Sequence, residues 1–291
     1  MWRLAVAVLG AVVMCAGCAK SDPPPTSASS AGSPRSTAAA GQPPSAGGSP
    51  SAATRSRAAQ IPVAAELPLA GKMVGIDPGH NGGNFTNSAI INKIIWNGRA
   101  DESCDTTGTA TAGGYTEAQF NFSVAAYLRA DLIAAGARVV MTRDSNNGVG
   151  PCVTTRAQIL NDAHANVAID IHADGGPATG RGFTVLEPVA DGANDKVIAS
   201  SKAFGVDVRD AMLAYTTMPA STYYGASGVV ERNDLAGLNL TTVPKILVEC
   251  GNMPNATDAR MLTSPAFQQQ VARAFTAAIV AFLTGRPIAK G

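Results

Sequence analysis

Short apolar runs alternate with helical patterns along the chain from Gly71 onward. Runs of strand length that are rich in Val, Ile and Leu and end at Gly, Pro or polar residues are typical of strands buried on both faces of a sheet. Apolar residues that recur three and four positions apart are typical of amphipathic helices. The expected strands are residues 73–76, 138–141, 167–171, 182–186 and 245–248, and the expected helices are residues 116–135, 154–164, 194–215 and 266–284.

The clearest of these patterns is the helix at residues 116–135. Thr116 and Gln119 have the spacing of a capping box at its start, and Gly136 is a stop signal at its end. Alternating strands and helices predict an α/β fold. We expect a single domain with a mostly parallel twisted sheet, helices on both faces and an active site at the carboxyl ends of the strands.

Residues 81–114 interrupt this alternation. Gly, Asn and Thr dominate this segment, with a brief apolar piece, AIINKIIWNG, in its middle. A segment this long between a strand and its helix is more often functional than idle. We expect a loop or hairpin that is held by Cys104 on the same rim as His80 and that shapes or gates a cleft; the alternative is a passive surface loop.

The N-terminus has the layout of a secretory signal. Arg3 precedes an apolar stretch of about a dozen residues that is too short to span a bilayer. The stretch AGC, ending at Cys18, resembles a bacterial lipoprotein cleavage site, at which the cysteine becomes the acylated first residue. We expect a lipoprotein signal over residues 1–18 with lipidation of Cys18; the alternative is plain secretion after cleavage nearby.

Composition divides the rest of the chain. Residues 19–68 are mostly Pro, Ser, Ala, Gly and Thr, and such a segment cannot bury enough apolar surface to offset its ordering entropy. We therefore expect a disordered tether at 19–68, a folded domain at 69–285 and a short tail at 286–291. The formal net charge of +1 lacks the basic footprint of a nucleic-acid-binding protein.

Export favours disulfide bonds among the five cysteines. Cys15 would leave with the signal, and Cys18 is the expected lipid site. Cys250 ends an apolar run and is expected to be buried as a small hydrophobic residue. Cys104 and Cys152 both lie in polar, Gly- and Thr-rich surroundings, so we predict a disulfide between them.

Three apolar runs end on side chains that can carry chemistry. VGIDPGH ends on His80, VAIDIHADGG contains His172, and KILVECGN contains Glu249. Because ligands of open α/β sheets bind beyond the carboxyl ends of the strands, these side chains could share one rim. Glu117, in the first turn of the helix at 116–135, could point toward the same rim.

Each of these residues also has an ordinary structural interpretation. His80 alone could be a turn residue, His172 a satisfied strand histidine, and Glu117 an acid stabilised by the helix dipole. Glu249 is harder to explain in this way, because a carboxylate at the end of a buried run needs a partner or a shifted pKa. Two histidines and a glutamate are a known ligand set for catalytic zinc, but the long gaps here do not prove a site. We assign the third histidine, His164, to the surface.

A resemblance to a known family makes these candidates specific. DPGH, TEAQFNFSVAAYLRADLIAAGARVVMTRD, RAQILNDAHANVAIDIHAD and VPKILVECGNMPN occur in the order found in zinc-dependent N-acetylmuramoyl-L-alanine amidases of family 3. The chain looks most like single-domain mycobacterial and actinobacterial members, and the match runs from Gly71 to about Leu283. Asp170 departs from the pattern, which commonly has serine there.

The resemblance implies that His80, Glu117 and His172 hold one Zn²⁺ ion and that Glu249 is the catalytic glutamate. Zinc would activate water, and Glu249 would act as general base in cleaving the amide between N-acetylmuramic acid and L-alanine of peptidoglycan. We expect an exported monomer, bound to the outer face of the cytoplasmic membrane only through its lipid, or free in the periplasm or wall if merely secreted. The alternatives are a zinc peptidase cutting within the stem peptide and an inactive peptidoglycan-binding or adaptor protein.

Overall fold

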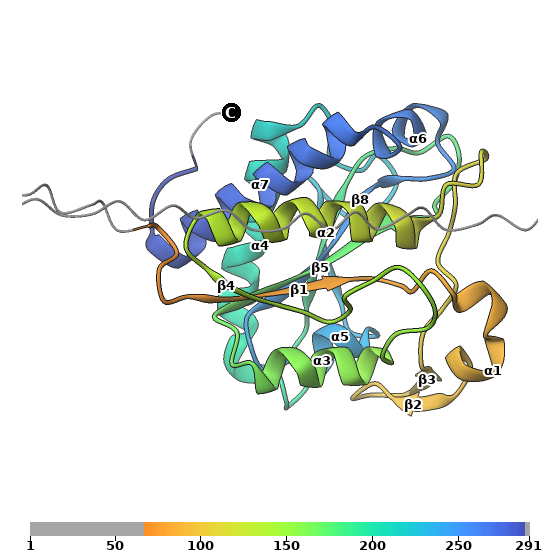
Figure 1. Ribbon diagram of the computed structural model, residues 1–291, viewed down its shortest axis with the longest axis horizontal. Coiled ribbons are helices and arrows are strands. Elements are labelled where there is room, and N and C mark those ends of the chain that lie inside the picture. Colours follow the sequence, from red (N-terminus) through yellow and green to blue (C-terminus); the bar gives the residue numbers. More distant parts are fainter. Residues whose placement is uncertain (1–66, 289–291) are drawn as a thin grey trace, which may run out of the picture. The chain divides into compact units, whose positions relative to one another are not determined.

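A computed structural model describes residues 67–288 of the chain. The expected signal, lipid site and tether, at residues 1–18, Cys18 and 19–68, lie outside the described residues except for the last two positions of the tether. Six strands form one sheet in the order β4-β1-β5-β8-β6-β7 (Figure 1). Neighbours are parallel except for the β6–β8 pair. The strands are β1 (Met73–Pro78), β2 (Ile94–Trp96), β3 (Asp101–Ser103), β4 (Arg138–Met141), β5 (Val167–Asp174), β6 (Thr184–Pro188), β7 (Val229–Arg232) and β8 (Lys245–Asn252).

Helices cover both faces of the sheet, so the predicted fold class is confirmed (Figure 1). The long helices α2, α4 and α7 pack on one face and on one another, whereas α3 and α5 pack on the other. Within residues 67–288 no helix is both long and apolar enough to cross a membrane. The helices are α1 (Ser88–Ile91), α2 (Glu117–Ala134), α3 (Val153–Asp162), α4 (Ile198–Tyr215), α5 (Ala236–Asn239), α6 (Ala256–Leu262) and α7 (Pro265–Thr284), with short 3₁₀ turns at Asn84–Thr86 and Asp195–Val197.

The caps of α2 follow from its sequence. The Thr116 hydroxyl accepts a hydrogen bond from the Gln119 backbone N–H, as expected for the N-cap of a helix. After the helix, Gly136 adopts a φ of +95°, and a Cβ at this position would lie 2.7 Å from the Leu67 Cβ. The helix therefore begins and ends within one residue of the range predicted from the sequence, residues 116–135.

Side-chain alternation divides the central strands between the two faces. In β5, Val167, Ile169 and Ile171 join the large core beneath α2, α4 and α7, whereas Ala168 joins the small core beneath α3. In β8, Ile246, Val248 and Cys250 face the large core, and Leu247 packs beside α5. Because alternate residues point to opposite faces, one set builds the core. The other set, which faces away from that core, includes the polar residues Asp77, Asp170, His172, Lys245 and Glu249.

The segment 81–114 contains a hairpin, which is one of the two forms, loop or hairpin, expected from the sequence. Strands β2 and β3 pair antiparallel, and Cys104, next after β3, forms a disulfide with Cys152. The Val153 backbone N–H donates to the Cys104 carbonyl over 3.0 Å, so the segment is held against the start of α3. The remaining cysteine of the described part, Cys250, is buried with its thiol reduced, as expected.

Candidate metal centre

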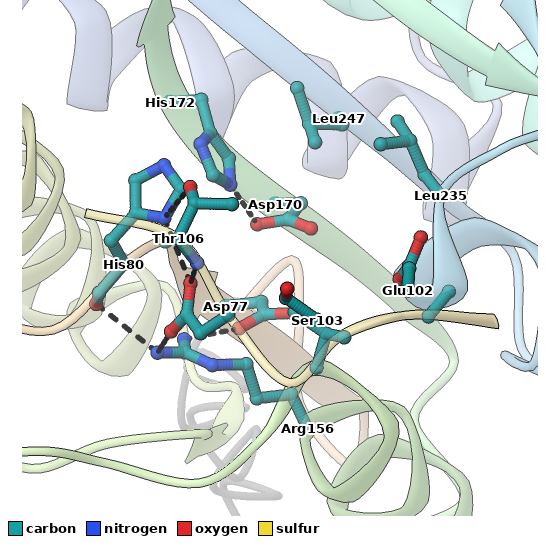
Figure 2. Close-up of a pocket in the computed structure, with 15 residues that line it drawn as sticks. Asp77, His80, Glu102, Ser103, Thr106, Arg156, Asp170, His172, Leu235 and Leu247 are labelled. Carbon is teal, nitrogen blue, oxygen red and sulfur yellow. Dashed lines mark hydrogen bonds and ion pairs between the residues drawn. The ribbon is translucent and has the colours of Figure 1, made fainter. Parts of the chain in front are cut away.

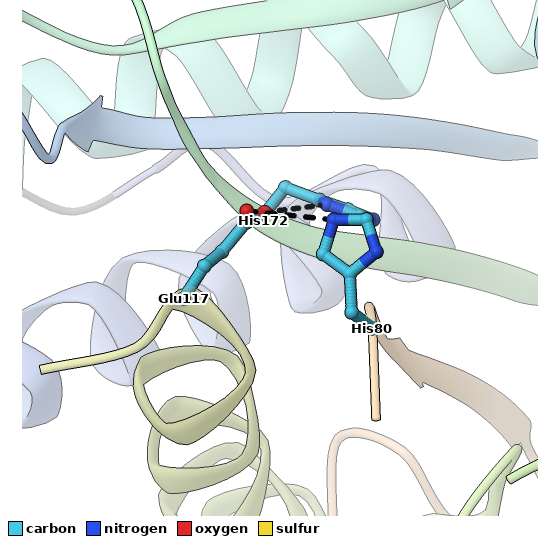
Figure 3. Close-up of side chains that lie close together, drawn as sticks. All are labelled: His80, Glu117 and His172. Atoms are coloured by element: carbon cyan, nitrogen blue, oxygen red, sulfur yellow. Dashed lines mark hydrogen bonds and ion pairs between the residues drawn. The ribbon is translucent and has the colours of Figure 1, made fainter. Parts of the chain in front are cut away.

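Three candidate ligands converge at the carboxyl end of the sheet. One ligating atom from each of His80, Glu117 and His172 lies within 4.8 Å of the other two (Figure 3). Glu117 lies between the histidines: its Oε2 is 3.4 Å from His80 Nε2, and its Oε1 is 2.8 Å from His172 Nδ1. The three residues are separated by up to 92 positions in sequence (80 to 172), so only the fold brings them together.

Different elements supply these side chains. His80 follows β1, His172 lies in β5 beside β1, and Glu117 is the first residue of α2. Two glycines leave room for the rings. A Cβ on Gly79 would lie 2.0 Å from His172 Nε2, and one on Gly108, which has a φ of +69°, would lie 2.6 Å from His80 Cδ2. Glycine is therefore required at both positions for the histidines to approach.

The charges in the cluster fit a divalent cation. Burial alone would lower the pKa of His80, but the Glu117 and Asp105 carboxylates raise it to about 9. Burial would raise the pKa of Glu117, yet both histidines hold it well below its usual range. Without a metal, protons on the imidazoles therefore balance the buried carboxylate. Two imidazole nitrogens and a carboxylate are also the donor set that zinc accepts, so a Zn²⁺ ion can replace those protons.

Glu249 lies beside this cluster in β8. Its Cα is in register with His172 of β5 on one side and with Thr184 of β6 on the other. The side chain is half-buried, and its Oε2 atom is buried with no hydrogen-bond partner among residues 67–288. Burial raises the pKa of Glu249 to about 8. A carboxylate that readily gains and loses a proton is what general acid–base catalysis requires.

Two cavities meet at the histidines. One, of about 340 Å³, is bounded by Ser103, Leu235 and Leu247 as well as by His80 and His172 (Figure 2). The other cavity, of about 450 Å³, is also lined by both histidines and has further lining residues of its own. The residues found in the second cavity but not the first include Thr107, Thr109, Glu117, Arg232 and Glu249. Residues 102–106 contribute to the first cavity and residues 106–109 to the second, with Thr106 shared, so the 81–114 segment lines the cleft.

A carboxylate contacts the outer nitrogen of each histidine. His80 Nδ1 is 2.9 Å from Asp105 Oδ1. His172 Nε2 is 3.2 Å from Asp170 Oδ1 (Figure 2). Neither aspartate was among the sequence candidates. A charged residue inside an apolar strand was the available signal for Asp170. Asp105 lies in an irregular loop whose path no local pattern predicts.

A buried ion network extends below the histidines on the same face of the sheet. Lys245 Nζ lies 2.7 Å from Asp77 Oδ2 and 3.2 Å from Asp170 Oδ2. Arg156 of α3 donates from Nη1 to Asp77 Oδ1 over 2.9 Å. These four residues are buried, with 1 to 6% of their surface exposed. They connect strands β1, β5 and β8 to helix α3 directly beneath the candidate ligands.

The third histidine lies outside the cluster. His164, just after α3, is exposed and adopts a φ of +47°. It lies outside the group of potential metal ligands found among the described residues. The assignment of His164 to the surface is confirmed.

Comparison with known proteins agrees with this geometry. The family model Amidase_3, described as N-acetylmuramoyl-L-alanine amidase, matches residues 74–281. The chain belongs to this amidase family. The N-acetylmuramoyl-L-alanine amidase Rv3717 of Mycobacterium tuberculosis H37Rv is 40% identical over 221 residues, which is 76% of this chain and 90% of that protein.

Solved structures of related amidases share the fold. The apo form of the amidase Ami1 from Mycobacterium abscessus is 42% identical, with a TM-score of 0.70, over 74% of this chain and all of that one (100%). Ami1 from Mycobacterium smegmatis is 40% identical, with a TM-score of 0.71, over 75% and 99% of the two chains. The chain is therefore an N-acetylmuramoyl-L-alanine amidase of a zinc-dependent family that acts on peptidoglycan. A cell-wall enzyme with a disulfide works outside the cytoplasm.

Proposed function

We propose that the amidase holds one zinc ion through His80, Glu117 and His172 and that Glu249 is its general base. The observation that carries this proposal is the convergence of two imidazole nitrogens and a carboxylate within 4.8 Å, in a cleft that Glu249 also lines. The bond cleaved is the amide between the lactyl group of N-acetylmuramic acid and L-alanine. A bound zinc ion would polarise the scissile carbonyl and make water more acidic.

Glu249 moves one proton in this scheme. Its carboxylate takes a proton from water as the water oxygen bonds to the carbonyl carbon. It then gives that proton to the amide nitrogen as the carbon–nitrogen bond breaks. The products are a lactyl carboxylate on the sugar and a stem peptide with a free L-alanine amine. The two cavities that meet at the histidines offer space for the sugar on one side of the bond and the peptide on the other.

Product analysis tests the assignment of metal and bond. We expect the zinc-loaded chain, incubated with muropeptides, to release a peptide with a free L-alanine amine and to leave the sugar intact, as read by mass spectrometry. Removal of zinc by a chelator should abolish release because no side chain replaces the Lewis acid. One equivalent of zinc should restore it.

The same measurement separates the alternatives. Fragments cut within the stem peptide would indicate a zinc peptidase instead. A zinc-loaded chain that binds peptidoglycan but releases nothing would indicate an inactive wall-binding or adaptor protein. Full release after complete removal of metal would contradict the proposed role of zinc.

We also propose that residues 69–285 form the catalytic domain and act as a monomer, with residues 286–291 as a tail. The signal at 1–18 would direct acylation of Cys18, and residues 19–68 would tether the domain to the outer face of the membrane. The sequence pattern supports this arrangement. In bacteria given labelled palmitate, the wild-type chain should carry label and Cys18→Ser should not. Secretion of an unlabelled wild-type chain would contradict the anchor.

A further inference from the structure

We propose that Asp105 and Asp170 are positioning residues for the metal, each binding the outer ring nitrogen of one histidine. This inference rests on the proposed ligand set and goes beyond it, because neither aspartate touches the metal position. Each histidine uses one ring nitrogen toward Glu117 and presents the other to an aspartate. The two carboxylates come from different elements and are held by different partners.

Asp105 is fixed from several sides. Its Oδ1 accepts from His80 Nδ1 over 2.9 Å and from the Thr106 backbone N–H over 2.7 Å. Its Oδ2 accepts from Asn81 Nδ2 over 2.9 Å and lies 3.8 Å from Arg156 Nη2. With 5% of its surface exposed, this carboxylate has little freedom. Its position therefore sets the orientation of the His80 ring.

The disulfide anchors Asp105 to the rest of the domain. Cys104 precedes Asp105 and is bonded to Cys152, the N-cap residue of α3. Arg156 lies one turn further along α3 and donates to the His80 carbonyl over 3.1 Å. The segment that carries Asp105 and the residue that Asp105 orients are thus both fastened to the start of α3.

Asp170 contacts His172 and is itself paired with Lys245. Its Oδ2 pairs with Lys245 Nζ at 3.2 Å, and its Oδ1 lies 3.2 Å from His172 Nε2. The Oδ1 atom is buried and has no hydrogen bond of good geometry within the described part of the chain. The His172 Nε2 atom, 3.2 Å away, is a ring nitrogen that can supply an N–H to this oxygen. A buried carboxylate oxygen without a hydrogen-bond partner costs free energy, so this contact favours the ring orientation in which His172 Nε2 faces Asp170.

These contacts determine which ring nitrogen can bind a metal. A neutral imidazole carries one N–H, and a carboxylate at one nitrogen holds the hydrogen there. The other nitrogen then keeps its lone pair: Nε2 in His80 and Nδ1 in His172, the two atoms that face Glu117. Carboxylates in this outer position also make the imidazole a stronger donor, and their loss costs about 10- to 100-fold in metal affinity.

Zinc affinity of the full chain tests the inference. We expect Asp105→Ala and Asp170→Ala each to raise the zinc dissociation constant, measured by competition with a chromogenic chelator, by about 10- to 100-fold. Asp105→Asn and Asp170→Asn keep an acceptor oxygen and should lose less. The absorption spectrum of Co²⁺-loaded protein should change in the alanine variants, which a purely structural role would not produce. Asp101→Ala, at an exposed position on the same hairpin, is the matched control.

A mutant cycle tests the role of the disulfide. The Cys104→Ser/Cys152→Ser variant should weaken zinc binding, and its effect should overlap with that of Asp105→Ala, because both act through the same carboxylate. Its effect should add to that of Asp170→Ala. Far-UV circular dichroism of the metal-free proteins identifies any variant that fails to fold, in which case the asparagine variants decide.

The outcomes distinguish this inference from the proposed function. Wild-type affinity and cobalt spectrum in folded Asp105→Ala and Asp170→Ala would overturn the inference while leaving the ligand set intact. A wild-type chain that binds no zinc at all would overturn the ligand set itself. Equal losses in Asp101→Ala would show a general effect of charge rather than positioning.

Discussion

Glu249→Gln is expected to lower kcat for release of the stem peptide by about 10²- to 10⁴-fold, the usual contribution of a general base. Glutamine has nearly the same shape but cannot take a proton from water. The wild-type carboxylate can take that proton because it lines the same cleft as the proposed ligands. Release of dye-labelled peptidoglycan, together with muropeptide masses, gives the rate.

The zinc content of Glu249→Gln shows whether the variant has lost only the general base or the metal site as well. Glu249 is outside the group that can hold the ion, so Glu249→Gln should keep one equivalent of zinc and the wild-type unfolding midpoint. Glu231→Gln, at an exposed position in the edge strand β7, is a matched control and should keep wild-type kcat. Full activity of Glu249→Gln would exclude Glu249 as the base.

Asp77→Asn is expected to lower the free energy of unfolding by about 3–5 kcal/mol near neutral pH, the usual cost of breaking a buried ion pair. The substitution leaves Lys245 and Arg156 buried without their shared anion. Urea unfolding of the metal-free chain measures the effect. Asp101→Asn, on the exposed face of the hairpin, should leave the free energy nearly unchanged.

The effect of Asp77→Asn should depend on pH in one direction. Burial would raise the pKa of Asp77, but Lys245 and Arg156 lower it well below the usual 3.8. A carboxyl whose folded-state pKa is lower than its unfolded one stabilises the fold above about pH 4. That stabilisation is lost as the pH falls toward the folded-state value. The difference between wild type and Asp77→Asn should therefore narrow at about pH 3. A constant difference would contradict the ion network.

Much of the fold could be predicted because core strands and long helices carry strong periodic patterns. The range of β4 was predicted to the residue, and α2 to within one residue at each end. Strands β5 and β8 run three or four residues beyond their apolar cores, because they continue through polar positions such as His172 and Asn252. The short helices were missed because two turns or fewer are too short to show a helical period. The edge strand β7 was missed because it has only two apolar residues, followed by Glu231 and Arg232.

The candidate site was predicted in its main part for a different reason. His80, His172 and Glu249 follow buried runs, and the carboxyl ends of neighbouring strands share an edge. Glu117 could be placed near this rim from its position in the first turn of a helix, but its role as a ligand came from the family resemblance, because an acid in a first turn is common without any metal. Asp105 could not be predicted, because a disulfide and loop contacts fix its place. The pairing of Asp77 with Lys245 could not be predicted either, because 168 positions separate the two residues in the sequence.

The alternation of side chains along β5 and β8 also limits how this enzyme can change. Deleting or inserting a single residue ahead of His172 in β5 or ahead of Glu249 in β8 would reverse the facing of that side chain. His172 or Glu249 would then point into the apolar layer under the long helices, and isoleucine or valine would point into the cleft. Variation in length is therefore expected in the connecting loops, such as the hairpin, and excluded from the two central strands.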